Sequence, residues 1–188
     1  MFKVISTISL LLVINTCLMS QASFDFYPKL LPKELSKVNG KDIDLKELSM
    51  KPELKRSIFL GKYFTVADFS SLSPVKYVYV GRVNTCRTGG CSIARVQDQE
   101  KESEFFDYFI FFDSNGTVQQ VKIYNYQSTH GQEVTSNNWL RQFKNYNGKA
   151  ELIAGNNVDA ISGATISVDA TIFDIEHKTN LLKKLILN

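Results

Sequence analysis

Two strand-like runs joined by a short polar loop constrain the fold of this chain more than any other feature. Residues 105–112 form an almost continuously apolar and aromatic run, and residues 118–126 form a second run with many β-branched and aromatic side chains. The loop between them contains Asn115-Gly116, and Asn-Gly between two such runs is the strongest short-range signal of a β-hairpin. The stretch therefore predicts two neighbouring antiparallel strands.

The segments around this hairpin extend it into an α+β domain. Residues 75–80 are β-branched or aromatic apart from one lysine, which predicts a further strand. Residues 136–143 predict a short helix, and the chain from Ala164 or Thr165 to Leu187 predicts a long one. Because the strands come first along the chain and these helices later, we predict an antiparallel sheet with packed helices.

The part of the chain before the first of these strands differs in composition and in its hydrophobic pattern. Residues 23–75 contain all four prolines and short amphipathic pieces at 30–38 and 43–48. This composition predicts a helical and loop-rich N-terminal lead-in that packs on the main domain, residues 76–188. The whole chain of 188 residues is long enough for one good core.

The first 22 residues have the pattern of a secretory signal peptide. Lys3 is followed by a mostly apolar stretch, and Ala22 offers a small residue before a cut. The stretch is too short to cross a bilayer comfortably. We therefore predict residues 1–22 to be removed and the mature protein to be exported, periplasmic or associated with the cell envelope. An uncleaved anchor and acylation of Cys17 are the alternatives.

Charge and composition exclude several classes of function. The hydrophobic fraction of 44% and the aromatic fraction of 12% exclude a disordered or low-complexity chain. The formal net charge is only +3, with no dense basic run. Because nucleic-acid binding needs a clustered Lys/Arg footprint, we expect no nucleic-acid partner.

Cys86 and Cys91 flank four residues that include Gly89 and Gly90. In an oxidising compartment two nearby cysteines usually pair, and the glycines would allow the tight turn that pairing needs. A local structural disulfide, a redox-active pair, and a metal or free-thiol role all remain open. A zinc site would need two more ligands at matching spacing, and the two histidines of the chain are isolated.

The start of the long C-terminal helix is the stretch with the clearest chemical character. Ser162 is a suitable N-cap, and Gly163 and Ala164 are small enough for an anion to approach the backbone. A helix N-terminus offers unpaired N–H groups and a partial positive charge. Thr165 adds a hydroxyl there, and Asp159 a carboxylate six residues earlier. These residues predict either a phosphate-sized pocket with a nucleophilic oxygen or a capped helix without a ligand.

The same residues resemble a known motif. Residues 159–165 read Asp-Ala-Ile-Ser-Gly-Ala-Thr and match the pattern Asp-x-x-Ser/Thr-Gly-Ala-Thr of the FMN-binding domain family. That family includes flavin-carrying components of the sodium-pumping NADH:quinone reductase and of the Rnf complex. The hairpin and the segments 128–133 and 139–143 follow in the order that the family shows, so the resemblance covers roughly residues 77–185.

The resemblance implies a covalent flavin. Thr165 would be esterified with the FMN phosphate by a flavin transferase that uses FAD and Mg²⁺. Ser162, Gly163 and Ala164 would form the turn that contacts the phosphate, and Asp159 would be the motif acid. Residues 76–188 would then be the FMN-binding domain.

Other residues would bear on such a flavin. His130 lies beside a glycine in a loop and would contact the flavin or simply end a strand. Lys76, Arg82, Arg87 and Arg95 lie in a stretch without acidic residues. If they lay near the flavin, their positive charge would stabilise its reduced form.

Three functions follow as hypotheses from these observations. The first is an extracytoplasmic electron-transfer flavoprotein, rather than a stand-alone enzyme, whose redox partner we expect to be a membrane protein. The second is an oxidoreductase in which the flavin exchanges electrons with the Cys86–Cys91 pair. The third is a structural or binding module of the same fold without a flavin.

Overall fold

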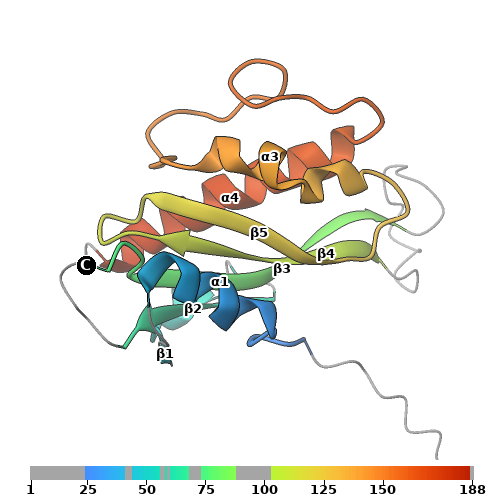
Figure 1. Cartoon of the computed structure of the whole chain (residues 1–188). Helices are drawn as coiled ribbons and strands as arrows, with labels where there is room; N and C mark the ends of the chain where they lie inside the picture. The colour runs from blue at the N-terminus through green and yellow to red at the C-terminus, as the bar shows by residue number, and fades with distance from the viewer. Residues whose placement is uncertain are drawn as a thin grey trace, which may run out of the picture.

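Five antiparallel strands follow one another across a single sheet in the order of the chain (Figure 1). The computed structural model describes residues 24–40, 44–55, 58, 60–67, 73–87 and 103–186. The strands are β1 (Leu45–Glu47), β2 (Gly61–Val66), β3 (Tyr77–Arg87), β4 (Ser103–Phe112) and β5 (Val118–Tyr126). The helical elements are α1 (Leu30–Asn39), α2 (Pro52–Lys55), η1 (Gln132–Thr135), α3 (Asn137–Leu140), η2 (Arg141–Phe143) and α4 (Thr165–Ile186). The predicted α+β class is confirmed.

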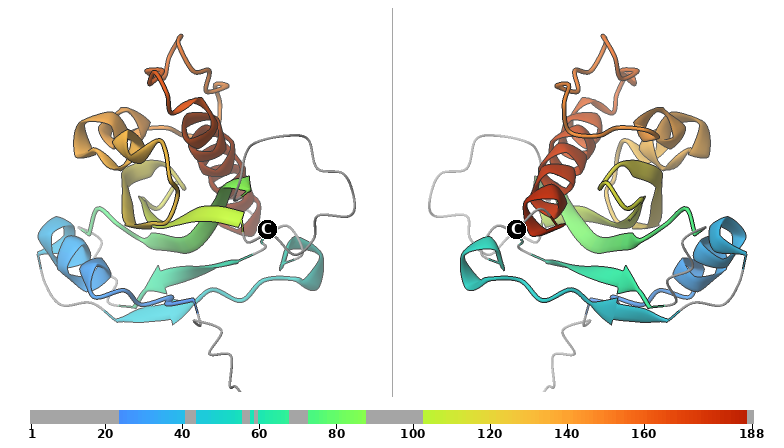
Figure 2. Two further views of the ribbon diagram at one scale, coloured as in Figure 1. Left: turned by 90° about the vertical axis from the view of Figure 1, so that its right-hand side faces the viewer. Right: turned by 90° about the vertical axis from the view of Figure 1, so that its left-hand side faces the viewer.

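Both faces of the sheet are covered, which explains why β4 is apolar at nearly every position. Successive side chains of a strand point to opposite faces. Phe109 and Phe111 therefore join the buried cluster that includes Leu31 and Leu35 of α1. The alternate positions of β4, from Phe106 to Phe112, join the larger cluster under α4. Figure 2 shows α1 and α4 on opposite sides of the sheet.

The lead-in contributes more to the sheet than we predicted. Helix α1 lies at the predicted position, but the predicted amphipathic piece 43–48 contains strand β1, and strand β2 was not predicted. Strand β2 pairs with β3 over Gly61–Thr65, and β1 pairs with β2. Because a central strand needs a hydrogen-bonding neighbour on each side, the lead-in supplies one neighbour of β3.

The predicted hairpin is present, and β5 has the predicted bounds. The Asp113 carboxylate accepts hydrogen bonds from the backbone N–H groups of Asn115 and Thr117, at 2.8 and 2.9 Å. Gly116 has a φ of +71°, a conformation that glycine adopts without steric cost. The polar loop thus fixes its own turn.

Strand β3 continues to residue 87, well past the predicted end at residue 80. It passes through Arg82, which is the cross-strand neighbour of Asp107 on β4. The Arg82 Nε donates to Asp107 Oδ1 at 2.6 Å, and the guanidinium lies 3.4 Å from the centroid of the Phe105 ring. The positive charge within the longer strand is therefore paired with a carboxylate on its neighbour.

The predicted helix at 136–143 is divided into α3 and the 3₁₀ turn η2. Residues 1–22 with Cys17, and also Cys91 and Arg95, lie outside the described residues, as do the side chains of Cys86 and Arg87. The predictions about the signal peptide and the cysteine pair therefore stay predictions. In the part of the chain that the structure describes, no helix has the length and apolar character of a membrane span.

Candidate functional site

Helix α4 begins at Thr165, after a tight turn. The Ala164 N–H donates to the Ile161 carbonyl at 3.1 Å, and Gly163 within this turn has a φ of +80°. The Val168 N–H donates to the Ala164 carbonyl at 2.9 Å and closes the first helical turn. Ser162 is therefore not the N-cap that we predicted, because the turn delays the start of the helix. The N–H groups of the first helical residues point outward without intrahelical acceptors.

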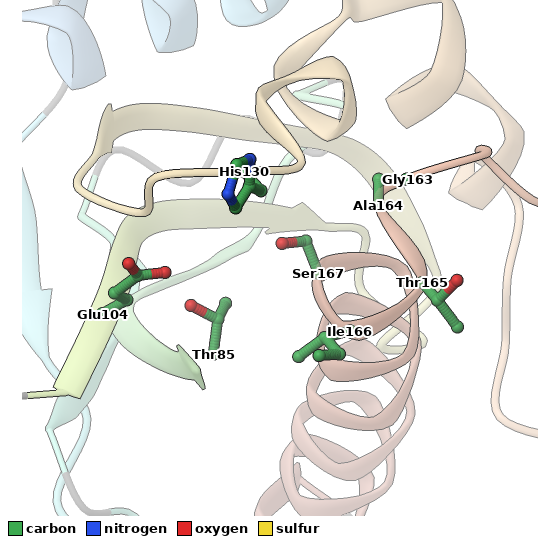
Figure 3. A pocket seen from close by; sticks show the side chains of 8 residues that line it. All are labelled: Thr85, Glu104, His130, Gly163, Ala164, Thr165, Ile166 and Ser167. Atoms are coloured by element: carbon green, nitrogen blue, oxygen red, sulfur yellow. The ribbon is translucent and has the colours of Figure 1, made fainter. Parts of the chain in front are cut away.

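A pocket of about 290 Å³ opens at this helix start (Figure 3). Its lining combines the helix start with the ends of two strands and one loop: Thr85, Glu104, His130, Gly163, Ala164, Thr165, Ile166 and Ser167. Figure 3 shows Ser167 turned toward Thr85 and His130, whereas the Thr165 side chain lies on the other side of the first helical turn. Thr165 is exposed and lies at the rim.

Of the predicted site residues, the structure brings His130, Gly163, Ala164 and Thr165 together around this pocket. Ser162 and Asp159 are exposed and do not line it. The arrangement thus includes the predicted helix start and the predicted loop histidine, but not the motif acid.

Asp159 is held through its backbone instead. Its N–H donates to Gln142 Oε1 at 2.7 Å, and its carbonyl accepts the Trp139 indole N–H at 2.8 Å. Trp139 and Phe143 are buried and meet edge to face, with 5.2 Å between ring centroids, and neither lines the pocket. Both aromatic residues therefore belong to the core, and Trp139 anchors the motif loop.

Sequence reasoning missed Thr85, Glu104, Ile166 and Ser167 as pocket residues. Ile166 and Ser167 follow Thr165 directly, so the helix start itself was the signal for them. Thr85 and Glu104 come from β3 and β4, and no local motif marks them.

The formal charge in the pocket lining is negative. Arg82 is paired with Asp107, and buried Lys76 precedes β3, so neither lines the pocket. Among the described lining residues the carboxylate of Glu104 is the one formal charge, and it accepts a hydrogen bond from the Thr129 hydroxyl. Where these two basic residues lie relative to a bound flavin stays a prediction.

A tyrosine ties the histidine loop to the helix. The Tyr126 hydroxyl donates to the His130 carbonyl and lies 2.9 Å from the Ser167 hydroxyl. Its ring stacks on Phe106 with 6.0 Å between centroids. Gly131 packs closely against Ser167 in this arrangement. A methyl group added to Gly131 would lie 2.6 Å from Ser167 Oγ, so a larger residue would clash there.

We predict that Gly131→Ala destabilises the protein by about 3 kcal/mol, combining the cost of a positive φ with that of a steric clash. Gly40→Ala is the matched control, because Gly40 has a similar φ of +76° but no atom within 4 Å of an added methyl group. It should cost only about 1 kcal/mol. Urea denaturation measures both, and equal losses would show that the loop does not depend on this close contact.

A comparison with known protein families gives a match that covers most of the pocket. Residues 104–173 match the family model described as FMN-binding domain. The matched range begins at Glu104 and includes His130 and the start of α4, and so it contains all the pocket residues except Thr85. No curated protein sequence matches the chain significantly. The match supports a flavin-binding protein with FMN as its cofactor.

Proposed function

We propose that the protein is an exported flavoprotein that carries FMN, bonded through its phosphate to Thr165, and passes electrons in a membrane-associated redox chain. The pocket at the start of α4 carries this proposal, because it lies at unpaired backbone N–H groups with Thr165 exposed at its rim, within the range that matches the FMN-binding domain. The sequence of residues 1–22 supports export.

The residues present fit an FMN phosphate. A methyl group on Gly163 would meet no atom within 4 Å, so the backbone of the turn is open to a ligand. Phosphate groups bind at helix N-termini because the N–H groups and the helix dipole both favour negative charge. The pocket volume of about 290 Å³ lies at the small end for ligand sites, so it would enclose only part of a cofactor.

The side chains around the pocket have distinct roles in this proposal. FMN, when bound, supplies the redox chemistry, and the protein positions it and adjusts its potential. The N–H groups of Thr165, Ile166 and Ser167 would hold the phosphate. Glu104 places a negative charge in the pocket wall, which disfavours further negative charge nearby and would lower the reduction potential.

Attachment requires a second protein. A flavin transferase with Mg²⁺ would join the Thr165 oxygen to the FMN phosphorus of FAD, with loss of the hydroxyl proton and release of AMP. The exposure of Thr165 supports this role, because the hydroxyl is accessible to another enzyme. The redox partner that we propose is a membrane protein, and the charge distribution gives no reason to expect a nucleic-acid partner.

Coexpression of the full chain with a flavin transferase tests the proposal. The exported protein should begin near Ser23, gain the mass of one FMN and keep its yellow colour after denaturation. Ser114→Ala should still gain FMN, because Ser114 is exposed in the hairpin turn and does not line the pocket. An unchanged mass, in cells where the same transferase loads another flavoprotein, would contradict the proposal.

A further inference from the structure

A second concave site lies on the far side of α3 from the motif loop. It is a groove of about 380 Å³ between α1, β5 and the segment that follows α3. Four cationic side chains line it and define what we call the basic groove: Lys37, Lys122, Arg141 and Lys144. Figure 1 shows α1 on one side of β5 and α3 on the other.

Only one carboxylate among the described lining residues balances these charges. Glu34 of α1 bonds Lys37 Nζ at 2.6 Å, and this hydrogen bond from Lys37 holds the pKa of Glu34 below its ordinary value. The groove therefore has a net charge of +3, which equals the formal net charge of the entire chain.

The other three cations lie farther from this carboxylate, and Lys122 is near enough to contribute to the lowered pKa of Glu34. Lys122 donates to Asn137 Oδ1 at 2.6 Å, and Arg141 donates to Asn138 Oδ1 at 3.1 Å. Within the described ranges, neither of these residues nor Lys144 forms an ion pair. An excess of cations over carboxylates in a concave site concentrates the electric field and attracts anionic partners.

The groove follows the outer edge of the sheet. Residues 119–122 of β5 all line it, although successive side chains of a strand point to opposite faces. Four consecutive residues can share one groove only if the groove runs along the edge of their strand. β5 is the terminal strand of the sheet, and its first residue, Val118, bonds outward through its backbone to Asn145 and Tyr146.

We propose that the basic groove binds an extended acidic segment of a partner protein, which lies along the edge of β5 between α1 and α3. An extended chain places side chains on both sides of its backbone, and the cations come from both sides of β5. Lys122 on the edge strand disfavours pairing with a second copy of this basic edge and favours an acidic strand.

Other anions fit the groove less well. A bilayer presents a flat surface, whereas these cations line a hollow between two helices. A free phosphate would need donors that converge on one point, whereas the cations are spread over three parts of the chain. An extended acidic segment can reach all of them at once.

One segment of the chain connects the basic groove with the motif loop of the candidate flavin site. Arg141 of η2 lines the groove, while the next residue, Gln142, holds the backbone of Asp159. A partner in the groove would therefore contact the segment that anchors the motif loop. Binding of a partner in the groove does not require a bound flavin.

Fluorescence anisotropy with a labelled peptide of alternating glutamate and valine tests the proposal on the full chain. The triple variant Lys122→Gln, Arg141→Gln, Lys144→Gln should bind this peptide roughly tenfold more weakly than the unaltered protein. Binding should also weaken as the salt concentration rises, because salt screens exposed charges. A peptide of alternating glutamine and valine should not bind.

The matched control removes the same charge elsewhere. Lys46, Lys51 and Lys149 are exposed and lie outside the groove, so their triple replacement by glutamine should leave peptide binding within about twofold. Equal losses in the two triple variants would overturn the proposal, because net charge alone would then explain binding. It would also be overturned if phosphatidylglycerol vesicles or inorganic phosphate, and not the peptide, showed the groove-dependent loss. Circular dichroism should show both variants folded, since the six side chains are exposed or half-buried.

Discussion

Thr165→Val should abolish covalent FMN on the coexpressed protein. Valine keeps the β-branched shape of threonine but lacks the oxygen that would form the ester. Thr165 is exposed at the first position of α4, so the substitution should change the free energy of unfolding by only about 0.5 kcal/mol. Intact mass and in-gel flavin fluorescence measure the adduct, and urea denaturation measures the stability.

Thr165→Ser is the companion variant, because it retains a hydroxyl at the same backbone position. We expect it to keep at least part of the attachment that Thr165→Val loses. An adduct that persists in Thr165→Val, or that maps to a peptide without residue 165, would show that the acceptor lies elsewhere. Such a result would leave the FMN-binding match intact while removing the assignment of the attachment to Thr165.

Asp174→Ala should destabilise the protein by about 3–5 kcal/mol, because it leaves a buried ammonium group without its counter-charge. Lys178 Nζ lies 3.1 Å from Asp174 Oδ1, and the two side chains are only 6% and 14% exposed. The Tyr108 hydroxyl donates to the same carboxylate. Burial, with a smaller contribution from Asp174, raises the pKa of Tyr108 well above its ordinary value, so the tyrosine stays a neutral donor.

Two further variants isolate this effect. Asp174→Ala combined with Lys178→Met should recover part of the lost stability, since the buried ammonium group is removed while the Tyr108 hydroxyl still lacks its acceptor. Asp169→Ala, at an exposed position of the same helix, should cost no more than about 0.5 kcal/mol. Similar losses for Asp169→Ala and Asp174→Ala, measured by urea denaturation, would contradict a role for the buried pair.

The features that sequence alone predicted well are local ones. The hairpin follows from Asn115-Gly116 and the apolar runs beside it, and α4 starts at one of the two residues predicted. Strand β2 was not predicted, because its pairing with β3 is not local and the prolines around it suggested loops. The ion pair of Arg82 could not be predicted for a similar reason, since its partner Asp107 lies 25 residues away.

The candidate site divides in the same way. Its helix side, from Gly163 to Ser167, could be located from the motif and the helix start. Its strand side, Thr85 and Glu104, depends on the register of β3 and β4 and on where α4 crosses the sheet. Those relations are tertiary, and no pattern in a single segment contains them.

The burial of β4 on both faces bears on how the molecule unfolds. The part that matches the FMN-binding domain ends inside α4 and excludes α1, yet Phe109 and Phe111 within it pack against the cluster that includes Leu31 and Leu35. Removing residues 24–40 would expose those aromatic rings to water, with a large loss of hydrophobic stabilisation. The N-terminal lead-in and the main domain, residues 76–188, should therefore unfold in one cooperative transition. A fragment limited to residues 104–173 is not expected to fold independently.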